Sequence, residues 1–160
     1  MTVNEYNTIL RYQQTPPVDI TALVTELGLS VYEEYDLPDG VSGVICRDTS
    51  GESPSGYLIR VNANDVYKRQ RFTIAHEFAH YLLHRDKIGD GITDDAMYRS
   101  DKMTSQDEFA ANNKAADLLM PRNLVLKYFA EGTDTAEGLA HVFQVSVPAM
   151  QVRLRYLLHV

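Results

Sequence analysis

The chain has 160 residues, with 15 Lys or Arg against 22 Asp or Glu, so its formal net charge is −7. That acidic balance argues against general nucleic-acid binding, and a single cysteine, Cys46, excludes an intrachain disulfide and every zinc site built from several thiolates. The length predicts one domain, and the low cysteine content favours a reducing, cytosolic compartment. The polar first residues lack the apolar core of a signal peptide, and no run approaches the roughly 20 apolar residues of a membrane span, so we expect no leader and no membrane contact.

Apolar periodicity and turn residues predict helices first, then a small sheet, then helices again. Pro16 and Pro17 end the first helix, and the second begins after Asp19 as its N-cap and ends at Gly28. In chain order we expect helices over 4–14 and 20–27, strands over 29–35, 41–47 and 57–63, and helices over 66–84, 106–120, 121–130, 135–143 and 147–158. A loop rich in Asp and Gly spans 86–105. This order predicts an α+β fold with a three-stranded sheet packed on helices.

The strongest chemical signal is the pattern His-Glu-x-x-His at residues 76–80. His76 and His80 are four residues apart, so on a helix they share one side and can both reach one zinc ion at about 2.0–2.1 Å. Glu77 is turned away from that axis, which suits a general base that takes a proton from water. The alternative is that both histidines are ordinary polar residues at the edge of the core.

Two histidines leave such a site one ligand short. Cys46, His141 and His159 are candidates, but Glu108 is better placed. The helix over 106–120 carries Glu108 on the same face as two alanines, and small residues allow close approach to another helix. From spacing alone, Glu108 is equally well explained as an acid favoured by the N-terminal dipole of its helix.

Two further side chains are expected near the site. Asn112, four residues after Glu108, can orient the ligands by hydrogen bonding. His84 continues the histidine stripe, but three ligands on one straight helix would spread over about 12 Å. We therefore expect His84 to support a ligand, to donate to the oxyanion, or to be structural. Tyr98 and Arg99 are the other candidates for stabilising the oxyanion.

Taken together, these residues resemble the ImmA/IrrE family of bacterial and phage metallopeptidases. The resemblance rests on three blocks, at 56–64 leading into 71–84, at 108–121 and at 139–154. In that family the glutamate of the second block is the third zinc ligand, which favours Glu108. One departure is Lys114, which stands where the family usually has a bulky apolar residue. We expect the packing of its helix, or a partner surface, to differ there.

The resemblance implies a zincin-like metallopeptidase domain over 1–133, with a C-terminal helix-turn-helix-like segment over 134–160 packed on it. It implies one zinc ion, held by His76, His80 and Glu108, with Glu77 as the catalytic base. The implied substrate or partner is a helix-turn-helix transcriptional repressor encoded nearby, as in stress-response, mobile-element or toxin–antitoxin-like pairs. Zinc peptidases often bind substrate along an edge strand, and residues 57–62 are the expected strand here.

Two other functions stay open. The protein could be a zinc-holding module that regulates its partner by association without cleavage. It could also bind DNA through residues 144–153, which resemble the turn and second helix of a helix-turn-helix. Because the charges from Pro121 onward nearly balance, we do not expect direct DNA binding.

The charges are unevenly distributed along the chain. Four basic residues oppose only Asp65 around the entry to the histidine helix: Arg60, Lys68, Arg69 and Arg71. This clustering predicts a basic patch beside the site that could receive a partner protein.

Overall fold

The computed structural model describes residues 1–89 and 103–159. Its helices are α1 (Val3–Tyr12), α2 (Ile20–Glu26), α3 (Tyr67–Leu83), the short 3-10 helix η1 (Arg85–Lys87), α4 (Ser105–Leu119), α5 (Arg122–Ala130), α6 (Ala136–Phe143) and α7 (Val147–Leu158). Its strands are β1 (Ser30–Glu34), β2 (Gly43–Arg47) and β3 (Tyr57–Asn62). The α+β prediction is confirmed, and each expected helix and strand is found with its ends within two residues. Within the described ranges, no helix has the length and apolar character needed to cross a membrane.

Local sequence explains where several helices begin and end. Thr2 and Glu5 form a reciprocal capping box at the start of α1. The predicted N-cap of α2 is present, because the Asp19 carboxylate accepts a hydrogen bond from the backbone N–H of Ala22 at 3.1 Å. Gly28 ends the segment with a φ of 93°, which a residue with a side chain rarely adopts.

The sheet has the strand order β1-β3-β2. β3 pairs parallel to β1 and antiparallel to β2, so that Ile59 lies between Val31 and Ile45. The expectation that residues 57–62 form the edge strand was therefore wrong. Leu58 and Val61 of β3 are buried together with Ile59, as suits a strand covered on both sides, and β2 is the edge strand next to the histidine helix.

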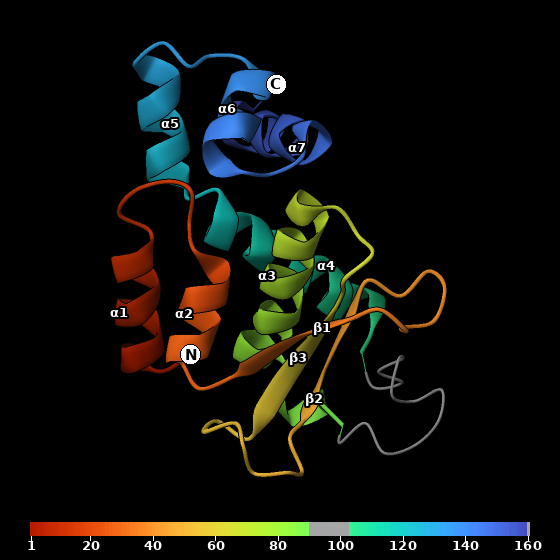
Figure 1. The fold of residues 1–160 in the computed structure, drawn as a ribbon. Helices are drawn as coiled ribbons and strands as arrows, with labels where there is room; N and C mark the ends of the chain where they lie inside the picture. Colours follow the sequence, from red (N-terminus) through yellow and green to blue (C-terminus); the bar gives the residue numbers. More distant parts are fainter. Residues whose placement is uncertain (90–102, 160) are drawn as a thin grey trace.

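α3 occupies the centre of the fold and packs against α2, α4, β2 and β3 (Figure 1). Its buried side chains Ile74, Phe78 and Leu82 join a core that extends from α1 to α7. The C-terminal helices α5–α7 lie at one end of this assembly, beyond the N-terminal half of α3 (Figure 1). The sheet and α4 thus flank the helix that carries the histidines.

Of the four residues of the predicted basic patch, Arg71 lies inside the fold, whereas Arg69 is exposed. Arg71 is 6% exposed, and its guanidinium donates to the backbone carbonyls of Val18 at 2.8 Å, Gln144 at 3.0 Å and Phe143 at 3.3 Å. These bonds tie the start of α3 to the end of α6. Arg60 pairs with Glu34 of β1. A sequence count cannot tell such an internal guanidinium from a surface one.

Candidate metal centre and active-site cleft

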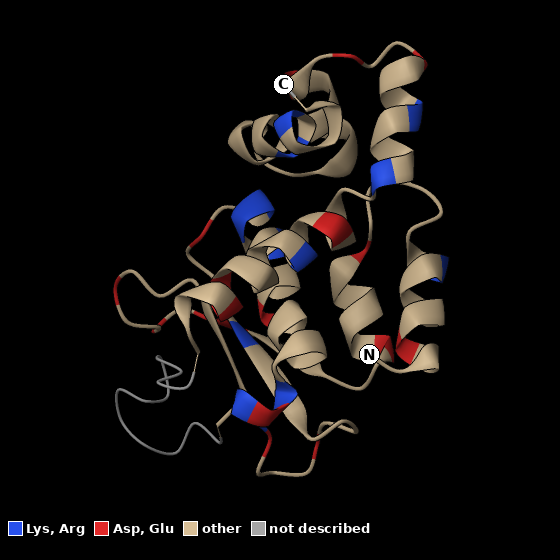
Figure 2. Ribbon diagram, turned by 180° about the vertical axis from the view of Figure 1, so that it is seen from behind, with Lys and Arg blue, Asp and Glu red and all other residues tan. Residues whose placement is uncertain are grey.

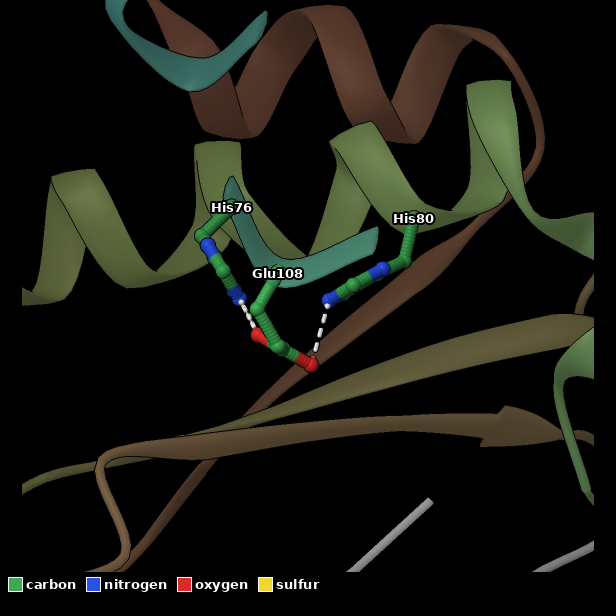
Figure 3. A group of neighbouring side chains, drawn as sticks. All are labelled: His76, His80 and Glu108. Atoms are coloured by element: carbon green, nitrogen blue, oxygen red, sulfur yellow. Dashed lines mark hydrogen bonds and ion pairs between the residues drawn. The ribbon is translucent and has the colours of Figure 1, made fainter. Parts of the chain in front are cut away.

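Three side chains from α3 and α4 converge beside the sheet (Figure 3). His76 and His80 stand one turn apart on α3, and the first turn of α4 brings the Glu108 carboxylate between them. Glu108 Oε2 lies 3.0 Å from His76 Nε2, and Oε1 lies 3.2 Å from His80 Nε2. Their ligand atoms lie within 4.8 Å of one another. In the described part of the chain, no other three His, Cys, Asp or Glu side chains gather this closely.

The donor set of this group suits a divalent ion such as zinc. Two ligands that bind zinc tetrahedrally at about 2.0–2.1 Å lie about 3.3 Å apart, close to the separations from Glu108 to the two imidazoles. The His80 side chain is 4% exposed and that of Glu108 is 48% exposed. The group is therefore anchored on its protein side and open to solvent on the other.

The contacts of His76 also suit a metal ligand. Its Nδ1 lies 2.8 Å from the Asn112 side-chain oxygen, which only accepts, so Nδ1 must carry a proton. Nε2 faces the Glu108 carboxylate, which is again an acceptor. With Nδ1 donating to Asn112, His76 turns the lone pair of Nε2 toward Glu108, and a metal ion held by both would satisfy them. Asn112 would then be a partner that orients a metal ligand.

His80 is held by a chain of polar contacts that leads away from the site. Its Nδ1 lies 3.0 Å from His84 Nδ1, and His84 Nε2 lies 3.3 Å from Asp107 Oδ1. The other Asp107 oxygen accepts from the Lys87 ammonium and, at 2.9 Å, from the backbone N–H of Thr104. These donors hold the pKa of Asp107 well below its usual range, so Asp107 is a carboxylate that only accepts.

These contacts are compatible with one pair of tautomers. If neutral His84 carries its proton on Nε2, facing Asp107, its Nδ1 is an acceptor. His80 then donates from Nδ1, which leaves the lone pair of its Nε2 facing Glu108. Burial lowers the pKa of His80 and favours the neutral form that a metal ligand requires. His84 therefore lies behind a candidate ligand and is not one itself.

Glu77 lies on the β2 side of α3, in a cleft with a volume of about 510 Å³. Phe72 and His76 of α3, Asn112 of α4 and residues 40–43 before and within β2 also line this cleft. Burial, and then the negative charge of Glu108, raise the pKa of Glu77 to about 8, while the backbone N–H of Ile45 opposes that rise.

Gly43 lets β2 run close to α3 beside Glu77. A Cβ at this position would lie 2.4 Å from Thr73 Cγ2 and 2.9 Å from the backbone oxygen of Arg60. Only glycine permits this approach without displacement of the strand.

The other residues considered from the sequence lie away from the metal centre or outside the described residues. Cys46 is buried in β2, and His141 and His159 lie on or at the ends of α6 and α7, so none of the three belongs to the group. Tyr98 and Arg99 lie outside the described residues. Sequence reasoning overlooked Asp107 and Gly43. For Asp107 a signal existed, because Thr104-x-x-Asp107 is a capping-box pattern that marks the start of the helix.

The arrangement of two histidines one turn apart, a glutamate after the first and a carboxylate from a second helix is typical of HExxH metal-dependent hydrolases. The chain belongs to the family of IrrE N-terminal-like domains, Peptidase_M78, whose family model matches residues 18–155. It is 31% identical over 124 residues to the radiation response metalloprotease IrrE of Deinococcus deserti, an alignment that covers 72% of this chain and 43% of that protein.

The fold also resembles a solved structure. A Mycobacterium tuberculosis transcriptional regulator superimposes with a TM-score of 0.60 at 16% identity, over 97% of this chain and 47% of that one. The chain thus spans less than half the length of both proteins. The resemblance to the ImmA/IrrE family is confirmed by the family match.

Proposed function

We propose that the protein is a zinc-dependent metalloendopeptidase that hydrolyses a peptide bond in a specific partner protein. The observation that carries the proposal is the convergence of His76, His80 and Glu108 beside Glu77 at the wall of an open cleft. Membership in a peptidase family, and similarity to a protein named a metalloprotease, support it.

His76, His80 and Glu108 would hold one zinc ion, with Asn112 and His84 fixing the two imidazoles. When bound, zinc would supply positive charge that polarises the peptide carbonyl and lowers the pKa of water. Glu77 is placed to take the proton from that water and to return it to the leaving amine. A cation in the group would offset the charge of Glu108 and so favour the ionised, basic form of Glu77.

The edge strand β2 offers a binding surface for an extended substrate. The Ser42 carbonyl accepts from the backbone N–H of Asn62 at 2.7 Å, so residues 42 and 62 form a bonded pair. Because bonded and non-bonded pairs alternate along an antiparallel ladder, Gly43 and Ile45 direct their backbone groups away from β3. The Ile45 N–H bonds Glu77 and the Arg47 N–H donates to the Gly89 carbonyl at 2.8 Å, so a peptide could add to this edge at Gly43 and pass beside Glu77.

The proposed substrate is a helix-turn-helix transcriptional repressor encoded nearby, which acts with the protease in the cytoplasm. The resemblance to the ImmA/IrrE family motivates this choice. Direct DNA binding by this chain is not part of the proposal.

The test is incubation of the zinc-loaded protein with the repressor encoded beside it, followed by mass spectrometry of the products. We expect discrete cleavage that Glu77→Gln abolishes without loss of zinc, whereas Glu33→Gln, at an exposed position on β1, cleaves like wild type. Equal cleavage by Glu77→Gln would refute the role of Glu77. An intact repressor in a stable complex with the protein would favour regulation by association instead.

A further inference from the structure

A second concave surface lies at the opposite end of α4 from the metal centre. We call it the α1–α5 groove; it is formed mainly by Tyr6 and Leu10 of α1, Lys114 and Asp117 of α4, and Arg122 at the start of α5. The groove has a volume of about 210 Å³. Lys114 is six residues after Glu108, which places it about 9 Å along the helix and about 120° around it. A molecule bound here would leave the cleft beside Glu77 open.

Two basic side chains of the α1–α5 groove have no acidic partner in the described part of the chain. Lys114 is half-buried and Arg122 is exposed, and neither has an ion pair within residues 1–89 and 103–159. The acid of the groove, Asp117, is already engaged by Arg153 at 2.9 Å.

The position of Arg122 adds to this positive potential. It occupies the first turn of α5, whose N-cap Pro121 provides no side-chain cap and whose first turn has no acid. A cation at the positive end of a helix dipole is unfavourable. Figure 2 shows basic residues along α5, on a chain whose formal net charge is −7. The basic character of the groove is therefore a local exception on an acidic protein.

The same groove exposes apolar surface. Tyr6 is 52% exposed and Leu10 is 41% exposed, and they stand one turn apart on α1. Gln13 anchors this wall, because its side-chain amide donates to the backbone carbonyls of Asp117 at 2.9 Å and Leu118 at 3.1 Å. The α1 and α4 walls are therefore held together before any partner binds.

We propose that the α1–α5 groove is a docking site for an acidic amphipathic segment of a partner protein. An apolar side chain of that segment would pack against Tyr6 and Leu10, while flanking carboxylates would pair with Lys114 and Arg122. Charge complementarity selects this occupant, because carboxylates would neutralise two cations that the chain itself leaves unpaired. The apolar wall gives the segment its hydrophobic contact.

One wall of the groove lies outside the matched family domain. α1 precedes the residues that the family model matches, whereas the α4 and α5 walls lie within them. The inference does not depend on the proposed peptidase activity, because no residue of the metal centre lines the groove.

Peptide selection on the intact, immobilised protein tests the proposal, once with zinc and once after chelation. A phage-displayed library of random 16-residue peptides is the probe, and enriched peptides are resynthesised for fluorescence anisotropy. We expect enriched sequences to combine Asp or Glu with Leu, Ile or Phe, and to bind with and without zinc. The double variant Lys114→Glu/Arg122→Glu should bind them at least tenfold more weakly, and Lys127→Glu, farther along α5, should bind like wild type.

Further variants separate binding from folding. Lys114→Met keeps the length and apolar stem of the side chain, so it should fold normally and still bind acidic peptides several-fold more weakly. Leu10→Ser should weaken the same peptides through the apolar wall. Enriched peptides that lack acids, or that bind the double variant as well as wild type, would overturn the proposal. So would self-association in sedimentation that the double variant abolishes, because a second copy would then be the occupant.

Discussion

Replacing His84 by leucine tests whether the polar chain behind His80 prepares a metal ligand. His84→Leu places an apolar side chain of similar size at the end of α3 and removes the nitrogen that lies 3.0 Å from His80 Nδ1. The donor on His80 then has no acceptor, and its ring is free to rotate or change tautomer. The variant should therefore bind zinc more weakly while its metal-free form folds like wild type.

The size of the effect follows from burial. Loss of the outer partner of a zinc-bound histidine costs about 10–100-fold in metal affinity, and each tenfold is about 1.4 kcal/mol. The His80 side chain is 4% exposed, so water cannot readily replace the lost acceptor, and we expect the upper part of that range. Asn112 supports His76 from an exposed position, where water can substitute. Asn112→Ala should therefore cost about tenfold or less.

Competition for zinc against a chelating dye gives the affinities directly and needs no substrate. His84→Asn should recover part of the loss, since its side-chain oxygen can take the place of Nδ1 as an acceptor. Thr104→Ala is the matched control: it removes the capping partner of Asp107 at the start of α4 but leaves the contact between His84 and Asp107. Wild-type affinity for zinc in His84→Leu, or an equal loss of affinity in Thr104→Ala, would refute the proposed role of the polar contacts behind His80.

Three other predictions address the fold and the metal. Gly43→Ala should lower the free energy of unfolding by about 1–3 kcal/mol, as overpacking does, because its Cβ would lie 2.4 Å from Thr73 Cγ2; urea denaturation measures this, and an unchanged midpoint would show that β2 does not need the close approach. Arg71→Met leaves three carbonyls without their donor, at about 1–3 kcal/mol for each unsatisfied group, so we expect severe destabilisation. Arg69→Gln, at an exposed position, should change stability little. Similar melting curves for the two variants would contradict this. Chelation should abolish cleavage and lower Tm, and zinc should restore both; activity that persists after complete removal of metal would exclude a metallopeptidase.

Much of the local structure could be predicted because its causes lie within a few residues. The apolar periodicity and the Asp19 cap predicted the helices and strands to within two residues. The spacing of His76 and His80 placed both imidazoles on one side of a helix, since four residues make about one turn. Spacing alone could not choose Glu108 as their partner; the family resemblance favoured it, and the structure brings it between them.

Other features were decided only by the tertiary structure. Which strand lies at the edge depends on long-range pairing, so β2 rather than β3 borders the cleft. Arg71 counts as a surface charge in the sequence, but it lies inside the fold, where it donates to the carbonyls of residue 18 and of residues 143 and 144, two segments distant in the chain. Asp107 looks like one more acid of an acidic stretch, yet the packing of α4 on α3 places it behind His84.

The sequence by itself thus determined the elements, the α+β class and the helix that carries two histidines and a glutamate. These properties follow from side-chain periodicity and capping, which act over one or two turns. Only the tertiary structure decided what completes the site and what surrounds it: the carboxylate of Glu108, the chain from His80 to Asp107, the edge strand and the basic groove beside α1. Each of these needs segments far apart in the chain to meet, and such meetings are set by the packing of the whole core.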